Sequence, residues 1–389
     1  MRLLYVCFDR GVAIGGSKGA GVHAAELLRA LEGEGHDTLV LARAVATNFE
    51  ARVPPVVTGA QLKLPLLRPR AVRRDVSELL DRRHLRQMLC EAISEFSPDA
   101  VYERHSLFHA ETAAEAHRHG IPLVLEVNAP LAREQRNFRG LALPALAGRI
   151  ERRAWASADL VVVPSRPLAD LVRASGCKRV LVVPNAVDPA LFEVTRADWL
   201  RAELGLEARY VVCYAGSLKP WHDLETVVEA VSRLPAELAP SMLVVGDGPE
   251  RNRVVEQAES LGVNLHLAGA VEHGEVGRYM RAADVCVAPL AADRSLHYFS
   301  PLKALEYLAA GRPAVVAAAG DLADFAGAGA ALSYPPRDAP ELAKALARVA
   351  TDAALRERLE RSGRELARTR TWRAAARTIV EAIESLPSG

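Results

Sequence analysis

One helix start in this chain brings together a lysine and a carboxylate at a spacing that suits ligand binding. In residues 297–313, HYFSPLKALEYLAAGRP, Ser300 can cap a helix and Pro301 suits its first position. Lys303 and Glu306 then share one face of that helix. The lysine suits a phosphate near the helix N-terminus, and the carboxylate suits the two hydroxyls of a ribose. Taken alone, an exposed Lys–Glu pair explains these residues better.

Two further loops pair glycines with polar or charged residues. In Gly216-Ser217-Leu218-Lys219-Pro220-Trp221-His222, Lys219 and His222 stand at the entrance of a helix, with Asp223 as its cap. A cation beside helix N–H groups predicts a phosphate site, whereas the alternative is a solvated lysine with a structural histidine. In Gly246-Asp247-Gly248-Pro249, a tight turn explains both glycines as well as a ligand does.

The Gly-rich segment 15–21 precedes the first long helical pattern. Gly16 and Gly19 would let backbone N–H groups approach a phosphate or an acceptor, and the alternative is a flexible surface turn. Residues 19–24 also match the G-x-G-x-x-A dinucleotide fingerprint, but about a dozen residues separate them from the preceding strand. The next strand, moreover, does not end with the acidic residue that belongs to this fingerprint. No P-loop occurs, and the absence of a D-x-D pair predicts that no metal is obligatory.

Short apolar runs alternate with helical patterns in both halves of the chain. Runs of this kind predict strands that are buried on both faces, as in parallel doubly wound sheets. They lie at 3–7, 38–42, 99–103, 121–129 and 158–165, and again at 210–216, 242–248, 264–269, 284–290 and 313–320. Because ligands bind past the carboxyl ends of such strands, two halves facing each other would form a cleft. The fold predicted is α/β, with two Rossmann-like doubly wound domains.

The predicted organisation has two domains and a terminal helix. The first domain covers residues 1–190 and the second 191–370, and the amphipathic helix in 371–389 crosses back to pack on the first. A chain of 389 residues is too long for one ordinary core. Its net charge of +1 gives no indication of nucleic-acid binding, and five scattered cysteines without a C-x-x-C pair predict buried, reduced thiols.

The sequence says little about where the protein is located and which acceptor it uses. The chain opens without a signal peptide and has no apolar run long enough to span a bilayer, so a cytoplasmic location is expected. A basic segment at 67–74, with arginines at 82, 83, 133, 136 and 139, suits anionic lipid headgroups or a phosphorylated acceptor. A solvated face of an arginine-rich protein is the alternative. Peripheral contact with the inner membrane face is therefore a hypothesis.

In their order and spacing, these segments resemble the GT-B retaining glycosyltransferases of family 4, also called glycosyl transferases group 1. The resemblance covers nearly the whole chain. Val183–Asp188 resembles the V-P-N-G-V-D hinge, and Gly216–His222 resembles the diphosphate loop in its G-S-x-K-P-W-H variant. Gly246–Pro249 is similar to the next strand end, and Gly269–Val271 to the segment that meets the nucleobase. Residues 298–306 resemble the SPLK variant of the E-x7-E motif.

The resemblance implies a nucleotide-sugar donor in the second half, an acceptor in the first, and transfer with retention. Glu306 would bind the donor ribose, and Lys219 would neutralise the leaving diphosphate together with His222 or Lys303. The implied catalytic residues are Lys219, Glu306 and Asn128. The implied donor contacts are Gly16, Gly19, Gly216, Ser217, His222, Gly246, Val271, Tyr298, Ser300, Leu302 and Lys303.

Three positions depart from the family pattern. Tyr298 stands where the first glutamate of E-x7-E falls, and Ser217 stands where the diphosphate loop commonly has arginine. Asn128 stands where a histidine is often found, so sugar contacts there must differ. An asparagine can still orient a sugar by hydrogen bonds. Glu126 and His105 are weaker candidates for the same site.

The function predicted is transfer of a sugar from a UDP- or GDP-sugar to a hydroxyl acceptor, which is a saccharide, a lipid-linked molecule or a small molecule. One alternative is a nucleotide-sugar 2-epimerase on the same scaffold. Another is an NAD(P)-dependent oxidoreductase that uses residues 19–24. A third is a binding module without activity, in which Tyr298 and Asn128 mark lost chemistry.

Overall fold

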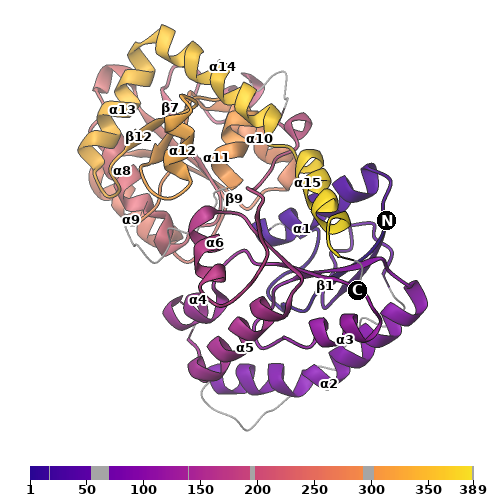
Figure 1. The fold of residues 1–389 in the computed structure, drawn as a ribbon. Coiled ribbons are helices and arrows are strands. Elements are labelled where there is room, and N and C mark those ends of the chain that lie inside the picture. Colours follow the sequence, from indigo (N-terminus) through magenta and orange to yellow (C-terminus); the bar gives the residue numbers. More distant parts are fainter. Residues whose placement is uncertain (17, 54–69, 139, 193–197, 292–301, 388–389) are drawn as a thin grey trace. The chain divides into compact units, whose positions relative to one another are not determined.

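The computed structural model describes residues 1–16, 18–53, 70–138, 140–192, 198–291 and 302–387 (Figure 1). The chain divides into two compact units. The first comprises Met1–Pro184 and Arg373–Gly389, and the second comprises Asn185–Trp372. Each unit is built on a parallel six-stranded sheet, which confirms the predicted α/β class with two doubly wound domains.

The sheet of the first unit has the order β2-β1-β3-β4-β5-β6. Its strands are β1 (Arg2–Cys7), β2 (Asp37–Ala42), β3 (Ala100–Arg104), β4 (Leu123–Glu126), β5 (Leu160–Val163) and β6 (Val180–Val182). The chain adds β2 on one side of β1 and β3 on the other. The carboxyl ends of β1 and β3 therefore form the switch point at which such sheets bind ligands.

The helices of this unit connect successive strands. They are α1 (Gly19–Gly33), α2 (Arg70–Phe96), α3 (Thr112–Arg118), α4 (Leu131–Phe138), α5 (Pro144–Ser157) and α6 (Arg166–Arg173). In α1, the apolar positions predicted from the helical spacing, Val22, Ala25, Leu28 and Leu31, are all buried. The helix forms because this stripe covers the sheet, and it ends at Gly33.

The sheet of the second unit has the order β12-β11-β10-β7-β8-β9. Its strands are β7 (Val211–Ala215), β8 (Ser241–Val245), β9 (Asn264–Gly269), β10 (Val285–Ala288), β11 (Ala314–Ala317) and β12 (Leu332–Tyr334). Here the direction of strand addition reverses between β7 and β10. The switch point of this sheet thus lies at the carboxyl ends of those two strands.

Helices and three short 3₁₀ turns complete the second unit. The helices are α7 (Asp198–Glu203), α8 (Leu224–Ser232), α9 (Arg251–Leu261), α10 (His273–Ala282), α11 (Leu302–Ala309), α12 (Leu322–Gly327), α13 (Ala339–Thr351) and α14 (Ala353–Thr369). The 3₁₀ turns are η1 (Pro189–Leu191), η2 (Pro220–His222) and η3 (Ala236–Leu238). All residues of β7, β8, β10 and β11 are buried, as their continuous apolar runs predict.

The last helix, α15 (Trp372–Glu384), returns to the first unit. Its apolar stripe of Ala376, Ile379 and Ile383 is buried. Arg373 and Arg377 pair with Glu34, the residue that follows α1. The prediction that the C-terminal helix crosses back to the N-terminal domain is confirmed (Figure 1).

Candidate functional site

Three loops of the second unit meet at the carboxyl ends of β7, β8 and β9. The N–H of Gly216 donates to the carbonyl of Val245 at 2.8 Å, and that of Gly246 donates to Gly269 at 2.7 Å. Between the same loops, the Leu218 N–H donates to the Asp247 carbonyl at 3.0 Å. These backbone bonds hold the predicted diphosphate loop, Gly216–His222, against the turn that begins at Gly246.

The close crossing of two loops explains the glycines at positions 246 and 248. A Cβ at Gly246 would lie 2.0 Å from the carbonyl oxygen of Gly216, and one at Gly248 would lie 2.4 Å from that of Leu218. Gly246 also has a φ of +134°, which side chains rarely allow. Close backbone packing therefore requires glycine at 246 whether or not the residue also contacts a donor.

Lys219 is the half-buried N-cap residue of η2. Among the residues that the structure describes, no carboxylate forms an ion pair with its side chain. The carbonyl of neighbouring Trp221 accepts the Ala291 N–H at 2.9 Å, which ties this loop to the end of β10. A partly buried cation at the switch point of a parallel sheet suits an anionic ligand.

The hydroxyl of Tyr214, in β7, organises the basic groups of this loop. Lys303 Nζ lies 3.0 Å from Tyr214 Oη and 4.7 Å from the ring centroid. His222 Nδ1 lies 2.7 Å from the same hydroxyl and 2.6 Å from the Ser217 carbonyl. Because a carbonyl only accepts, His222 Nδ1 carries the proton and donates. Tyr214 and His222 are both buried, so the arrangement is held by packing as well as by hydrogen bonds.

Burial lowers the pKa of both basic side chains. Burial lowers the pKa of Lys303 to about 7, although Glu306 on the same helix favours the charged form. Burial, followed by the charge of Lys303, holds the pKa of His222 well below its usual value. An anion arriving here would restore the positive charge of Lys303, because an opposite charge favours the ionised form.

The remaining donor candidates are spread over the same edge. Leu302 is the first residue of α11, and Glu306 lies one turn further along it, half-buried. Val271 follows β9 and packs against the core of the second unit. The predicted contacts Tyr298 and Ser300 lie outside the described residues. Tyr307 holds the helix in place, since its hydroxyl accepts the Ala215 N–H at 3.0 Å and donates to the Ala215 carbonyl at 3.1 Å.

In the first unit, the Gly-rich segment folds back on itself before α1. The Gly15 N–H donates to the Gly21 carbonyl, and the Gly16 N–H donates to the Ala13 carbonyl. A Cβ at Gly21 would lie 2.1 Å from the Ala13 carbonyl oxygen, so glycine is required there. Gly19 is already the first residue of α1. The G-x-G-x-x-A residues thus lie inside the helix, unlike the strand-to-helix turn of a dinucleotide fingerprint.

Gly19 offers a test of ligand approach in this segment. A Cβ at this position meets no atom within 4 Å, so Gly19→Ala should leave the free energy of unfolding unchanged or slightly raised. If a ligand approaches the backbone here, the added methyl group should lower turnover about tenfold. Steady-state kinetics and thermal melting check this, with Gly33→Ala, at an equally open position, as the matched control. Unchanged turnover would remove Gly19 from the site.

A buried ion cluster lies at the carboxyl ends of β3 and β4. Glu126, 3% exposed, bonds through one oxygen to His23 Nε2 and through the other to Arg104 Nη1 at 3.3 Å. Burial would raise the pKa of Glu126, but His23 and Arg104 outweigh it and hold that pKa at about 2. Glu126 therefore works as a buried anion that joins α1 to β4, two residues before Asn128. His23 was not among the sequence-predicted residues, although it directly follows Gly21 and Val22.

His105, the other weak candidate, faces a different neighbour. Its Nε2 lies 3.4 Å from Glu151 Oε1, and its ring meets Trp155 edge-on. The same Glu151 oxygen accepts the Ala132 N–H at 3.1 Å. His105 is thus packed against α5, while Glu126 contacts α1, and no contact between the two side chains is among those described.

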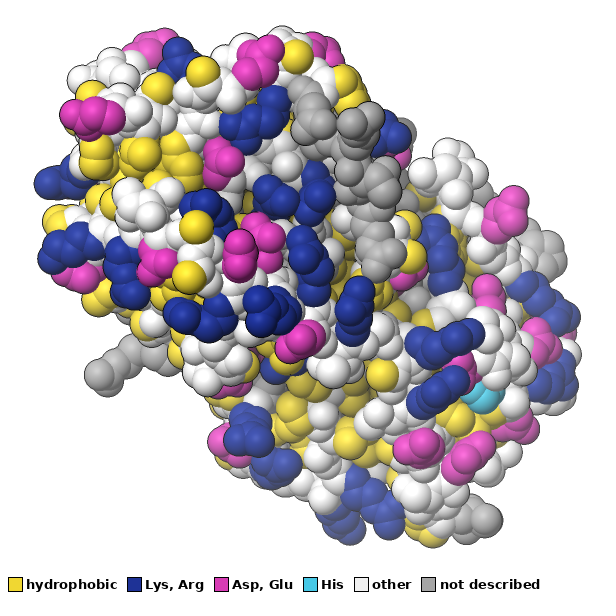
Figure 2. Space-filling view, turned by 90° about the horizontal axis from the view of Figure 1, so that it is seen from above, with side chains coloured by type: hydrophobic (Ala, Val, Ile, Leu, Met, Phe, Trp, Pro, Cys, Tyr) yellow, Lys and Arg dark blue, Asp and Glu magenta, His cyan; other side chains and the backbone are white. Residues whose placement is uncertain are grey.

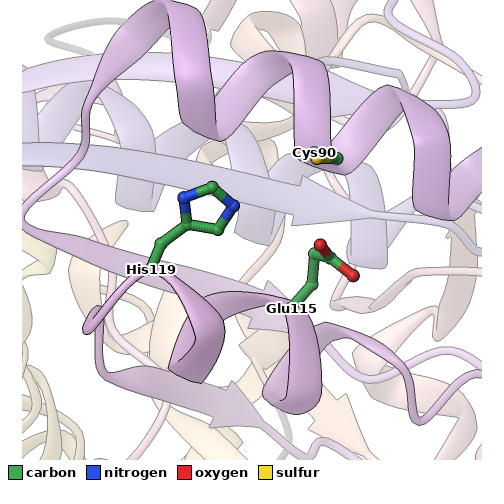
Figure 3. Close-up of side chains that lie close together, drawn as sticks. All are labelled: Cys90, Glu115 and His119. Carbon is green, nitrogen blue, oxygen red and sulfur yellow. The ribbon is translucent and has the colours of Figure 1, made fainter.

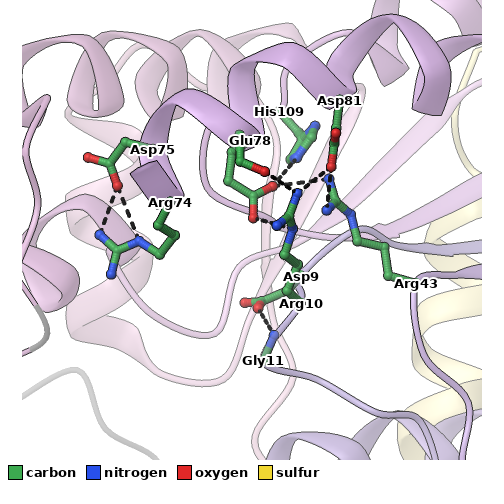
Figure 4. Close-up of polar contacts among 10 residues, drawn as sticks. Asp9, Arg10, Gly11, Arg43, Arg74, Asp75, Glu78, Asp81 and His109 are labelled. Carbon is green, nitrogen blue, oxygen red and sulfur yellow. Dashed lines mark hydrogen bonds and ion pairs between the residues drawn. The ribbon is translucent and has the colours of Figure 1, made fainter. Parts of the chain in front are cut away.

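A charge network fastens the loop after β1 to α2 (Figure 4). Arg10 pairs with Glu78, at 2.9 Å, and with Asp81. Arg43, which follows β2, pairs with the same two carboxylates at 3.0 Å each. Two arginines therefore meet two carboxylates, and buried His109 lies 3.4 Å from Glu78. The positive charges are compensated, so the network positions α2 over the strand ends and is not an anion site.

Three potential metal ligands lie together on α2, on α3 and at the residue that follows α3 (Figure 3). The ligand atoms of Cys90, Glu115 and His119 lie within 4.8 Å of one another. However, Arg86 and Arg118 each donate to the same Glu115 oxygen, at 2.8 and 2.7 Å. A dication would have to compete with these two guanidinium groups. The ion pairs account for the buried glutamate without a metal ion.

Comparison with known proteins identifies the family. Residues 17–191 match the model described as Glycosyltransferase Family 4, and residues 209–352 match the one described as Glycosyl transferases group 1. The chain belongs to this glycosyltransferase family. The family predicted from the sequence is confirmed, and the oxidoreductase alternative loses its support.

Curated relatives of this glycosyltransferase include two D-inositol 3-phosphate glycosyltransferases. That of Stackebrandtia nassauensis is 36% identical over 221 residues, which cover 53% of this chain and 48% of the relative. That of Nocardioides sp. is 30% identical over 304 residues, which cover 73% of this chain and 66% of the relative. The match therefore spans about half of the first relative's length and about two thirds of the second's.

Solved structures of similar proteins share the fold of this glycosyltransferase. Anabaena Alr3699/HepE in complex with UDP and glucose has a TM-score of 0.74 at 18% identity, and the match covers 98% of this chain and 99% of that chain. Sucrose-phosphate synthase from Thermosynechococcus elongatus has a TM-score of 0.76 at 20% identity, covering 99% of both chains. At these identities, the likeness establishes the fold.

Proposed function

We propose that this glycosyltransferase moves a sugar from a nucleoside-diphosphate sugar to a hydroxyl acceptor, with retention of configuration and without an obligatory metal. The observation that supports it most is the group of basic side chains at the β7–β10 switch point. Lys219 and His222 belong to the Gly216–His222 loop there, and Lys303 lies against it. An open parallel sheet binds its ligands at this place. Lys219, and Lys303 once an anion has restored its positive charge, would stabilise the charge on the leaving diphosphate, which is the main catalytic work of such a site.

We assign the donor to the second half of the chain and the acceptor to the first half. In this proposal Glu306 accepts hydrogen bonds from the ribose, and Asn128 in the first unit orients a sugar or acceptor hydroxyl. Printed names of similar proteins support the substrate class. HepE was crystallised with UDP-glucose, and a Mycobacterium tuberculosis relative, 25% identical over 302 residues, is a GDP-mannose-dependent phosphatidylinositol dimannoside mannosyltransferase. A hydroxyl of an inositol or of a saccharide is accordingly the acceptor that we propose.

A thermal-shift panel tests the donor class. UDP, GDP, dTDP, ADP, NAD and NADP are each added with and without magnesium. A ligand at a hundredfold excess over its dissociation constant stabilises the folded state by about 2.7 kcal/mol, which corresponds to a shift of a few degrees. We expect one nucleoside diphosphate to raise the melting temperature equally with and without magnesium. A shift with NAD or NADP alone would contradict the proposal.

Glu306→Gln tests the position of the nucleotide within the second unit. Losing hydrogen bonds from the ribose to a charged acceptor should weaken nucleotide affinity about tenfold. The matched control is Glu275→Gln, which changes an exposed carboxylate on α10 that pairs with Arg278. Equal affinity of the Glu306 variant and the parent would move the nucleotide away from α11.

Contact with a lipid surface remains a prediction. None of the helices in the described part of the chain combines the length and apolar composition that a bilayer crossing needs. Of the arginines in the predicted basic segment, Arg74 pairs with Asp75 and Arg82 with Glu111. Figure 2 shows Lys and Arg side chains interspersed with Asp and Glu on the visible face. This mixed charge disfavours binding of the protein to an anionic lipid surface. Sedimentation of the protein with anionic vesicles would detect such binding.

A further inference from the structure

The Lys303 amine occupies an unusual place at the proposed donor site. A Cβ at Gly216 would lie 3.3 Å from Lys303 Nζ, so the amine touches the backbone of the predicted diphosphate loop. Tyr214 Oη lies 3.0 Å away, and that hydroxyl donates to the Ser217 carbonyl at 2.8 Å. The amine is therefore held between α11 and the loop instead of extending into solvent.

Among the residues that the structure describes, few charged or titratable groups lie near this amine. Tyr214 of β7 contacts it, Glu306 of its own helix and His222 of the loop interact with it electrostatically, and Lys219 acts in turn on His222. On other elements packed against α11, Cys286 of β10 acts on Tyr307, and Arg364 of α14 contacts Gly311. Among these described groups Glu306 is the one carboxylate beside three basic side chains, so their balance lacks negative charge. A diphosphate would supply it.

We propose that Tyr214 positions the Lys303 amine at the diphosphate site, and that in mildly alkaline solution a sugar nucleotide binds with uptake of nearly one proton by Lys303. The inference rests on the proposed function. Above neutral pH most of the amine is uncharged and takes a proton from solvent as the diphosphate arrives, so this half-buried site carries little uncompensated charge until its ligand is present. The low pKa of the resting Lys303, about 7, is consistent with this order of events.

Proton uptake can be counted by titration calorimetry. UDP-glucose and GDP-mannose are titrated into the full chain in buffers of different ionisation enthalpy, and the slope of the heat against that enthalpy counts protons. Each phosphate of a sugar nucleotide has one ester and one anhydride linkage and therefore a single strongly acidic group, so the ligand itself does not titrate near neutrality. A group that shifts from a pKa of about 7 to an ordinary lysine value takes up about 0.9 proton at pH 8 and about 0.1 at pH 6.

Two variants separate the roles of lysine and tyrosine. Lys303→Met should abolish uptake at pH 8 and weaken affinity about thirtyfold, whereas Lys344→Met, at an exposed lysine paired with Glu341, should match the parent. Tyr214→Phe keeps the ring but releases the amine to water. The pKa of the Lys303 amine without ligand should then rise, which would at least halve the proton uptake at pH 8. Affinity for the sugar nucleotide should fall about tenfold.

The outcomes distinguish this inference from the function on which it rests. Binding with equal proton numbers in the parent and in Lys303→Met would overturn the proton uptake and leave the donor site intact. Normal uptake and affinity in Tyr214→Phe would overturn the positioning role of the tyrosine. A parent chain that binds no sugar nucleotide would overturn the proposed function, and this inference with it.

Discussion

Replacing Lys219 by alanine should lower turnover about 100- to 1,000-fold while weakening donor affinity only about threefold. The asymmetry follows from the reaction. Negative charge accumulates on the diphosphate as the glycosidic bond breaks, so a cation beside it stabilises the transition state more than the bound donor. Lys219 is half-buried and has no carboxylate partner among the described residues, which leaves its charge available for a ligand.

The measurement is release of nucleoside diphosphate from the sugar nucleotide that the thermal-shift panel selects. Lys219→Arg should recover part of the turnover, because the charge remains but the geometry changes. Lys178→Ala, at an exposed lysine of the first unit, is the control and should behave as the parent. Turnover within twofold of the parent in Lys219→Ala would remove this lysine from the catalytic machinery.

Glu126→Gln should destabilise the first unit by about 3–5 kcal/mol, because it removes the buried carboxylate that pairs with Arg104. Glu126 is 3% exposed and Arg104 9% exposed, so water cannot replace the lost partner. Hydrogen exchange of the amides in β3 and β4 measures this free energy. Glu95→Gln, at an exposed glutamate of α2, should lie within about 0.5 kcal/mol of the parent.

The double variant Arg104→Met with Glu126→Gln distinguishes charge from shape. Removing both charges should recover much of the lost stability, since neither group is then buried unpaired. If the double variant is less stable than Glu126→Gln alone, the charge explanation fails.

The same cluster predicts a pH dependence. Folding lowers the pKa of Glu126 from 4.5 to about 2, so the unfolded chain binds its proton more tightly than the folded chain. The stabilisation is therefore complete above about pH 4.5 and is lost as the pH falls towards 2. Glu126→Gln should flatten the acid limb of the unfolding curve across that window.

Much of the fold was predictable because buried parallel strands have a local signature. Continuous apolar runs such as 242–248 and 313–320 correspond to β8 and β11, which are buried throughout. The short edge strands β6 and β12 were not predicted. Each has three residues and a partly exposed pattern, so it lacks the long apolar run that marks a central strand.

In the candidate site, too, some features were predictable from the sequence and others were not. The pairing of Lys303 with Glu306 on one helix face follows from their spacing, and the lysine at the start of η2 follows from the Lys-Pro pattern. Glu126 could be recognised as a charged residue at the end of an apolar strand. Nothing in that stretch indicated that it contacts a histidine in α1.

By itself, the sequence determined the two α/β halves, the loops at their strand ends, the family and the residues offered for chemistry. Tertiary structure alone decided which of these residues meet. His23 and Glu126 are 103 positions apart, and Tyr214 and Lys303 are 89 apart. Local periodicity reports which face of an element is buried. The order of strands in the sheet brings distant strand ends together, and that order follows from packing of the whole chain.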